Sequence, residues 1–292
     1  MDQSLVLMHQ AMLADRPRLD AYDKALAASV RGGVVADVGA GTLALSLLAL
    51  RNGASHVYAV EADPGTAELA ARIAERNDLR GRLTVVRGDA RSVELPEPAD
   101  VVVSEMMGNL GPEEQMMEVL GAFNATNLAP GGRTVPERLV TRLAAVQFDG
   151  EGWGLWNGDF YGYTLDAVQE IAEPAAQLHF FQRPPTLLSR PTTVADQRPG
   201  GGASRLDAGR SLTITRPGRL HAVVGYFAAT LTKGVTLSNL PSYPGCNWAV
   251  WVWPLRHTPV TAGDMLRVRL VPPPDVRDVG RWRLECGLRK GR

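Results

Sequence analysis

The sequence of 292 residues contains no long hydrophobic run and only two cysteines, Cys246 and Cys286. No apolar stretch approaches the roughly 20 residues that a transmembrane helix needs, and no basic segment precedes an apolar one at the N-terminus. We therefore expect no membrane partner, no secretory signal and a cytoplasmic location. The cysteines are isolated and lack the spacing of metal ligands, which argues against a disulfide framework and leads us to predict no bound metal.

An excess of charge of one sign is also absent, because 31 lysines and arginines balance 31 aspartates and glutamates. Domains that bind nucleic acid through bulk electrostatics usually carry a basic excess, so we expect no nucleic-acid partner. The length of 292 residues suffices for roughly two domains of typical size.

The two halves of the chain differ in their hydrophobic pattern. In the first half, short β-branched runs alternate with helical segments, which predicts a parallel sheet built from βαβ units. The expected strands are 33–38, 57–60, 83–86 and 100–103, the expected helices are 42–51, 63–77 and 113–127, and Pro130-Gly131-Gly132 is expected to end this unit. After about Pro136, short β runs divided by turn residues predict an antiparallel barrel or sandwich. These runs are 139–147, 211–215, 220–228, 248–253 and 265–271.

A glycine-containing turn follows the first expected strand, at Asp37-Val38-Gly39-Ala40-Gly41. Gly39 and Gly41 allow the backbone to approach a ligand closely, and the N–H groups of the following helix face that ligand. Glu61 ends the second strand, where its carboxylate can accept both hydroxyls of a ribose. With Ala44 the turn also satisfies the relaxed dinucleotide pattern, so an NAD enzyme stays an alternative.

Two further features favour S-adenosylmethionine over NAD. Asp37 comes just before the first glycine, as in class I methyltransferases, and Gly88-Asp89-Ala90 ends the third strand like an adenine-binding turn. In such a turn Asp89 accepts the exocyclic amine and a backbone N–H reaches the ring nitrogen, so Asp89 and Ala90 are assigned to the cofactor. No histidine or lysine is positioned for hydride transfer. The alternative to a cofactor site is a purely structural glycine-rich turn with unrelated acidic residues on the surface.

The segment 104–114 follows the fourth strand, at the sheet edge where open α/β sheets bind ligands. Its glycines and Pro112 allow it to double back and bring Glu105 near Glu114. A guanidinium is planar, permanently charged and forked, so it suits two carboxylates. The carboxylates concentrate positive charge on the nitrogens that they face, and the remaining nitrogen is then better able to attack. Capping of the helix at 113–127 is the alternative, but it leaves Glu105 unexplained.

The segment 104–114 resembles the double-glutamate hairpin of the protein arginine methyltransferase family, with Met106 in place of the usual tryptophan. Residues 9–18 match the N-terminal H-x-x-M-L-x-D-x-x-R segment of that family. Residues 156–163 resemble the start of its dimerisation arm, and 220–227 resemble one of its barrel strands. On these motifs the chain is identified as a divergent, bacterial-type member.

The resemblance implies a Rossmann-like class I methyltransferase domain at 31–136, preceded by a helical segment at 1–30 that covers the cofactor. An antiparallel β-barrel or sandwich domain for the substrate follows at 137–292. The arm near 153–174 implies a homodimer. The implied cofactor is S-adenosyl-L-methionine, which leaves as S-adenosyl-L-homocysteine.

The resemblance also assigns individual residues. His9 lies at the cofactor, and Arg18 pairs with the carboxylate of its methionine part. Glu105 and Glu114 are the catalytic pair. Residues expected to position the substrate are Met12, Asp15, Met107, Asn247 and Trp248, and the space left beside Met12 and Met107 decides between one methyl group and two.

Several positions depart from the family pattern. Cys246-Asn247-Trp248 replaces a threonine-histidine-tryptophan loop, and Asn247 can hydrogen-bond Asp15 but cannot carry a proton at neutral pH. Leu43 replaces the third glycine of the cofactor turn, and Arg91 replaces an adenine-binding glutamate. The altered entrance and the neutral charge lead us to favour slightly free arginine or a small arginine-like metabolite over arginine in a peptide or protein. The alternatives are a methyltransferase for another small-molecule or peptide nitrogen, and a non-catalytic regulatory homologue that binds the cofactor.

Overall fold

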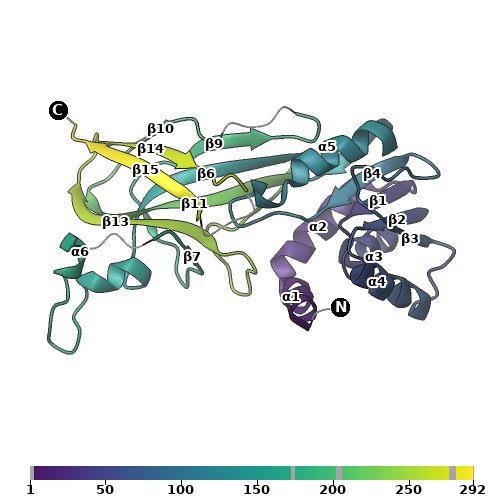
Figure 1. The fold of residues 1–292 in the computed structure, drawn as a ribbon, viewed down its shortest axis with the longest axis horizontal. Helices are drawn as coiled ribbons and strands as arrows, with labels where there is room; N and C mark the ends of the chain where they lie inside the picture. Colours follow the sequence, from purple (N-terminus) through teal and green to yellow (C-terminus); the bar gives the residue numbers. More distant parts are fainter. Residues whose placement is uncertain (1–2, 172–174, 202–205, 276–280, 292) are drawn as a thin grey trace.

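The computed structural model describes residues 3–171, 175–201, 206–275 and 281–291. It has two parts that lie end to end (Figure 1). One part is a parallel sheet with helices, and the other is built from antiparallel strands. The predicted order of a Rossmann-like domain followed by a β-barrel domain is therefore confirmed. The limits of the predicted domains stay a prediction.

The parallel sheet has the order β3-β2-β1-β4-β5. Its strands are β1 (Val34–Val38), β2 (His56–Glu61), β3 (Leu83–Arg87), β4 (Ala99–Ser104) and β5 (Leu128–Val135). The helices are α1 (Gln3–Ala14), α2 (Arg16–Ser29), α3 (Ala44–Arg51), α4 (Pro64–Arg76) and α5 (Met116–Asn127). The chain reverses its direction of strand addition between β1 and β4, and the carboxyl ends of all these strands meet at one edge. This is the position where open α/β sheets bind ligands.

Local signals set several helix ends as expected. Asp63 precedes Pro64 at the start of α4 and accepts a hydrogen bond from the backbone N–H of Thr66 at 2.7 Å. Helix α3 begins at Ala44 rather than at the predicted residue 42. The reason is that Leu43 has a φ of 69° and Gly41 a φ of 54°, and this left-handed turn keeps the segment out of the helix.

Two predictions about the hairpin region were wrong. The expected helix at 113–127 is broken into a 3-10 turn, η1 (Pro112–Glu114), and α5, because Gln115 lies in the left-handed region with a φ of 56°. Pro130-Gly131-Gly132 does not end the unit but lies within β5. These residues pair with no residue of β4, because the register jumps from Ala99–Leu128 to Val101–Arg133, and Gly131 has a φ of 78°. Their turn preference is thus kept as a bulge inside the strand.

The second half consists of antiparallel strands, as predicted. One sheet has the path β7-β13-β11-β6-β8, with β12 paired to β11 and β9 paired to β6, and a smaller sheet has the order β10-β14-β15. The strand bounds are β6 (Arg138–Gln147), β7 (Gln177–His179), β8 (Thr186–Leu187), β9 (Thr192–Gln197), β10 (Arg210–Thr213), β11 (Gly218–Thr232), β12 (Val235–Ser238), β13 (Val250–Val260), β14 (Met265–Val271) and β15 (Arg283–Arg289).

A shared apolar core joins the two parts. Tyr22 and Leu26 of α2 belong to the same buried cluster as Leu139, Phe227 and Trp248 of the second part. The rings of Phe227 and Trp248 meet edge to face with centroids 5.0 Å apart. This packing fixes the carboxyl edge of the parallel sheet against the barrel, and the hydroxyl of Tyr22 adds a hydrogen bond to the carbonyl of Ser104 at 2.9 Å.

A long excursion between β6 and β7 projects from the barrel at the lower left of Figure 1. It contains a 3-10 segment, η2 (Gly152–Asn157), and the short helix α6 (Val168–Ile171). The end of the predicted arm, residues 172–174, lies outside the described residues. In the described ranges, no helix is long and apolar enough to cross a membrane, and the cytoplasmic location stays a prediction.

Candidate active site

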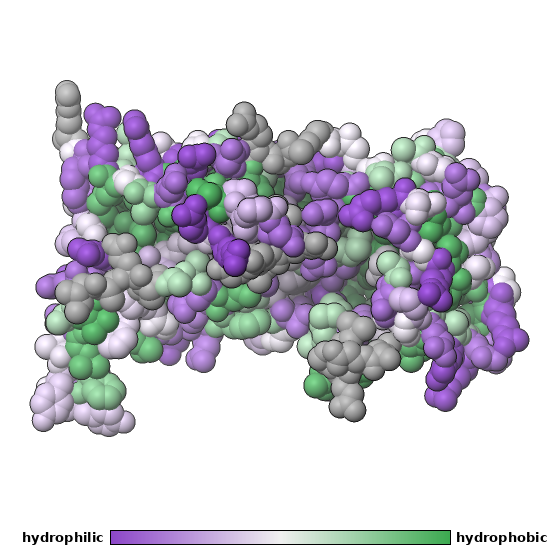
Figure 2. Space-filling model, viewed as in Figure 1, coloured by the Kyte–Doolittle hydropathy of each residue, from purple (hydrophilic) through white to green (hydrophobic). Residues whose placement is uncertain are grey.

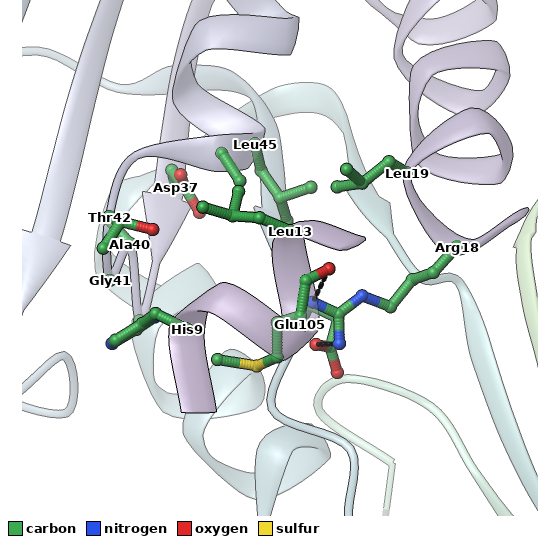
Figure 3. Close-up of a pocket in the computed structure, with 13 residues that line it drawn as sticks. His9, Leu13, Arg18, Leu19, Asp37, Ala40, Gly41, Thr42, Leu45 and Glu105 are labelled. Atoms are coloured by element: carbon green, nitrogen blue, oxygen red, sulfur yellow. Dashed lines mark hydrogen bonds and ion pairs between the residues drawn. The ribbon is translucent and has the colours of Figure 1, made fainter. Parts of the chain in front are cut away.

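A cavity of about 570 Å³ lies between the carboxyl edge of the parallel sheet and the barrel. Most of the predicted site residues line it, from five separate stretches of the chain. They are His9, Met12, Arg18, Gly39, Gly41, Glu61, Glu105, Met107, Glu114, Asn247 and Trp248. A second cavity shares six of these residues and adds Asp37 (Figure 3).

The glycine turn leaves no space for side chains. Gly39 and Gly41 both have positive φ values, and a Cβ atom on Gly39 would lie 2.8 Å from the sulfur of Met106. A Cβ atom on Gly41 would lie 2.8 Å from Cε1 of His9, so helix α1 places His9 directly over this turn. Leu43 keeps the left-handed geometry that a third glycine would adopt more easily, and its side chain is fully buried. The departure from the family pattern therefore changes the residue but not the shape of the turn.

The carboxylates around the turn are held in place by the chain itself. Glu61 accepts hydrogen bonds from the backbone N–H groups of Gly41 and Asp63, each at 2.9 Å. Each of its oxygens keeps a lone pair for a ribose hydroxyl. Asp37 accepts a hydrogen bond from the hydroxyl of Ser46 at 2.7 Å, and burial raises the pKa of Asp37 to about 6. The free lone pairs of Glu61 fit the ribose hydroxyls of S-adenosylmethionine.

Arg18 and Glu105 form a buried ion pair, with Nη1 of Arg18 2.8 Å from Oε2 of Glu105 (Figure 3). Nη2 of Arg18 donates to the carbonyl of Met12 at 3.2 Å, and the guanidinium lies 5.1 Å from the ring centre of Trp248. The sequence assigned Arg18 to the cofactor and Glu105 to the substrate, but the structure joins the two directly. Burial raises the pKa of Glu105 whereas the charge of Arg18 lowers it, so Arg18 favours the ionised carboxylate.

The hairpin brings Glu114 to the same cavity as Glu105, as predicted from its glycines and proline. Part of the Glu114 residue is exposed to solvent, while its carboxyl group lies in the cavity. Removal of water by its surroundings, followed by the negative charges of Glu105 and Glu113, raises the pKa of Glu114 to about 7. Glu113 points away and is buried. It accepts hydrogen bonds from the backbone N–H of Leu110 at 2.6 Å and from Nε1 of Trp251 at 3.2 Å.

The structure corrects the assignment of Asp15. Its side chain has no exposed surface and does not line either cavity. One oxygen caps α2 by accepting from the backbone N–H of Arg18 at 3.1 Å, and the other accepts from the backbone N–H of Asn247 and the hydroxyl of Tyr243, both at 3.0 Å. Asp15 thus fastens a barrel loop to the N-terminal helices, and Asn247 reaches it through the backbone rather than the predicted side chain.

Tyr243 is the residue that the sequence gave no reason to single out. It stands in a turn-rich segment with Pro241 and Gly245, and no spacing links it to Asp15, which is 228 positions away. Burial raises the pKa of the Tyr243 hydroxyl, so this group stays protonated and donates to Asp15.

Asp89 and Ala90 lie apart from the two cavities. Asp89 is exposed and accepts from the backbone N–H of Arg91 at 2.9 Å and from its Nη1 at 3.3 Å, while Ala90 is buried. Their assignment to the adenine ring stays a prediction.

Met107 contributes its backbone to the site, since its N–H donates to Glu105 at 3.2 Å and its carbonyl accepts from Nε1 of Trp248 at 2.9 Å. Among the described residues, no group of three potential metal ligands comes together.

The comparisons with known proteins agree with this geometry. A family model described as "Methyltransferase domain" matches residues 35–132. Protein arginine N-methyltransferase 1 of Chlamydomonas reinhardtii is 28% identical over 270 residues, which cover 88% of this chain and 77% of that protein. The probable histone-arginine methyltransferase CARM1 of Oryza sativa subsp. indica is 44% identical over 135 residues, covering 44% of this chain and 25% of that protein.

Two solved structures share the fold along nearly the whole chain. Protein arginine methyltransferase 10 of Arabidopsis thaliana, in an open conformation, has a TM-score of 0.77 and 24% identity and covers 97% of this chain and 93% of that one. The heterotetrameric PRMT1 enzyme–prozyme complex of Trypanosoma brucei with AdoHcy has a TM-score of 0.76 and 21% identity, covering 96% of this chain and 92% of that one. None of these similarities tests the bacterial-type assignment, which stays a prediction.

The family model, the named relatives and the shared fold lead to one conclusion. The protein is a methyltransferase, and its cofactor is S-adenosylmethionine. The chain is similar along most of its length to protein arginine N-methyltransferases and shares their fold, and its residues 35–132 match a methyltransferase domain.

Proposed function

We propose that this protein methylates a guanidino nitrogen of arginine residues in polypeptides. The observation that carries the proposal is the pair of carboxylates, Glu105 and Glu114, in one cavity with Arg18 and the glycine turn. A cation as broad and permanently charged as guanidinium requires two acceptors held apart at fixed positions. The hairpin at 104–114 supplies these two acceptors, Glu105 before its turn and Glu114 after it.

S-adenosylmethionine, when bound, supplies a methyl group made electrophilic by the adjacent sulfonium. Glu61 would hold its ribose, and Arg18 would hold the carboxylate of its methionine part. Glu105 and Glu114 bind two sides of the guanidinium and orient the third nitrogen toward the methyl group, so that the barrier falls mainly through positioning. The carboxylate of Glu114 accepts the proton released from the attacking nitrogen, because its pKa of about 7 suits a base at neutral pH.

The similar proteins support a polypeptide substrate over free arginine, and the charge of the cavity removes the argument that favoured free arginine. The similar proteins named above are arginine methyltransferases of proteins or histones. In addition, Glu61, Asp63, Glu105 and Glu114 all line the cavity, so its wall is acidic although the whole chain is neutral. The neutral net charge, which led the sequence analysis toward free arginine, therefore does not describe the entrance. The comparisons give no support to that preference.

Replacement of Glu114 by glutamine tests the proposed function. We expect Glu114→Gln to lower kcat by about 10²- to 10³-fold, because one fixed charge at the reacting group is lost. Mass spectrometry of an arginine-rich peptide and of free L-arginine, each incubated with enzyme and S-adenosylmethionine, measures the product. The matched control is Glu118→Gln, which removes an exposed carboxylate on α5 outside the cavity.

Each result of this experiment has a distinct meaning. Glutamate-dependent methylation of the peptide, faster than that of free arginine, supports the proposal. Faster methylation of free arginine would overturn the polypeptide part of it. Cofactor binding with no product on either guanidine would point to another nitrogen nucleophile or to a non-catalytic homologue.

The titration of Glu114 predicts how activity depends on pH. Only the ionised carboxylate attracts a guanidinium, so kcat/KM should fall about tenfold per pH unit below an inflection near pH 7 and level off above it. The bound cation stabilises the carboxylate, and the inflection in kcat should therefore lie at lower pH than that in kcat/KM. Initial rates at saturating and limiting peptide concentrations measure both profiles. An unchanged inflection in Glu114→Gln would show that another group titrates.

The contact between Tyr243 and Asp15 predicts an effect on cofactor binding. Tyr243→Phe removes one donor to a buried carboxylate and loosens the helix that carries Arg18, so we expect S-adenosylhomocysteine to bind about tenfold more weakly. Isothermal titration calorimetry measures the affinity. Ser242→Ala is the matched control, because the buried hydroxyl of Ser242 has no hydrogen-bond partner among the described residues. Equal affinities of the two variants would refute the role of Tyr243.

We propose further that the excursion between β6 and β7 mediates a homodimer. Tyr161 is 88% exposed and Tyr163 is 74% exposed, and Leu155 and Phe160 are exposed beside them. Aromatic side chains of this kind are enriched in protein interfaces and are costly to leave in water. One relative by structure is a heterotetrameric complex, which supports assembly in this fold.

The double variant Tyr161→Ser/Tyr163→Ser should shift the protein from dimer to monomer in sedimentation velocity experiments. Phe180→Ser serves as a control, because Phe180 is 59% exposed but lies outside the arm. A wild-type protein that sediments as a monomer at micromolar concentration, or equal dissociation of both variants, would contradict this interface.

A further inference from the structure

The small sheet β10-β14-β15 has two chemically different faces. On β14, Leu266, Val268 and Leu270 are buried in an apolar core, whereas Arg267 and Arg269 between them are exposed. Residues paired across antiparallel strands share a face, so the outer face can be read from the register. It carries Ser211 and Thr213 of β10, Arg267 and Arg269 of β14 with the half-buried Met265 and Val271 at the ends of that strand, and Arg283, Glu285, Gly287 and Arg289 of β15.

This outer face is basic in a chain whose net charge is zero. It presents four arginines and one glutamate, and Glu285 is taken by Arg269, whose Nη1 lies 3.4 Å from it. Arg267, Arg283 and Arg289 form no ion pair with any residue in the described ranges. In Figure 2, the end of the molecule where Figure 1 places β14 and β15 shows hydrophilic residues interspersed with hydrophobic ones.

A hollow opens beside Arg267 and Arg269. A cavity of about 620 Å³ is lined by Arg210, Arg267, Arg269, Glu285 and Gly287, together with Gly209, Ser211, Val268 and Cys286. Gly287 stands opposite Arg267, and a Cβ atom there would meet nothing within 4 Å. The glycine thus leaves an open floor between arginine side chains.

We propose that this arginine face binds an acidic, extended segment of a protein partner. Arginine binds carboxylates in a forked, bidentate manner. Arg267 and Arg269 stand two positions apart on one strand, a spacing of roughly 7 Å that an extended peptide repeats between alternate side chains. No aromatic residue lines the hollow, so the stacking platform on which single-stranded nucleic acids depend is lacking among these described residues.

The arginine face lies at the end of the molecule opposite the parallel sheet (Figure 1). A partner bound there leaves the cavity at Glu105 and Glu114 open. The inference does not depend on the proposed methylation of polypeptides, because it concerns different residues and a ligand of opposite charge.

Fluorescence anisotropy of a labelled oligo-glutamate peptide with the full-length protein tests this inference. We expect the charge-reversed variant Arg267→Glu/Arg289→Glu to bind the peptide at least about tenfold more weakly than the wild type. The control variant Arg31→Glu/Arg76→Glu changes the net charge equally at two exposed arginines near the parallel sheet, and should bind within about threefold of the wild type. Gly287→Val, which fills the hollow without changing charge, should weaken binding about threefold or more.

Circular dichroism of each variant reports whether it is folded, and Gly287→Val keeps the test valid if a charge-reversed variant unfolds. Equal losses in the two charge-reversed variants would overturn the proposal, because attraction would then depend on net charge alone. Absence of peptide binding by the wild type at low salt would also overturn it. So would tighter binding of a single-stranded oligonucleotide than of the peptide.

Discussion

The buried ion pair between Arg18 and Glu105 connects the N-terminal helices to the carboxyl edge of the parallel sheet. Removing one partner from such a pair leaves an uncompensated buried charge, at a cost of about 3–5 kcal/mol. The pair therefore holds α2 against the end of β4 and keeps His9 and Met12 over the glycine turn. The charge of Arg18 also lowers the pKa of Glu105 against the larger opposing effect of burial, and so favours the form that binds a cation.

Asp15 provides a second connection, from the same helices to the barrel. Its two oxygens accept from Arg18 on one side and from Tyr243 and Asn247 on the other. A fully buried carboxylate needs such donors to offset the loss of water. The two carboxylates thus have different tasks, although both stand near Arg18. Glu105 lines the cavity, while Asp15 holds its two walls together.

Much of the site could be predicted because its signals are local. The glycines of the turn, the acid at the end of β2 and the hairpin with Glu105 and Glu114 depend on backbone freedom and strand ends, which short motifs record. Gln115 shows where such reasoning fails. Glutamine is a good helix former, so its helix propensity predicts that Gln115 continues the helix. The hairpin instead holds Gln115 in a left-handed conformation. At Pro130-Gly131-Gly132 the turn signal was kept as a bulge, but β5 resumes its pairing with β4 at Arg133, which no local pattern announces.

The sequence by itself determined the class of fold, the order of the two parts and the chemistry of the cavity, because periodicity and capping act over a few residues. The tertiary structure alone decided which charges meet. Arg18 faces Glu105, Asp15 faces Tyr243 across 228 positions, and four arginines of β14 and β15 share one face. Alternation along a strand places Arg267 and Arg269 on one side, but which strands pair and which helices and loops meet follows from how the helices, the sheet and the barrel pack.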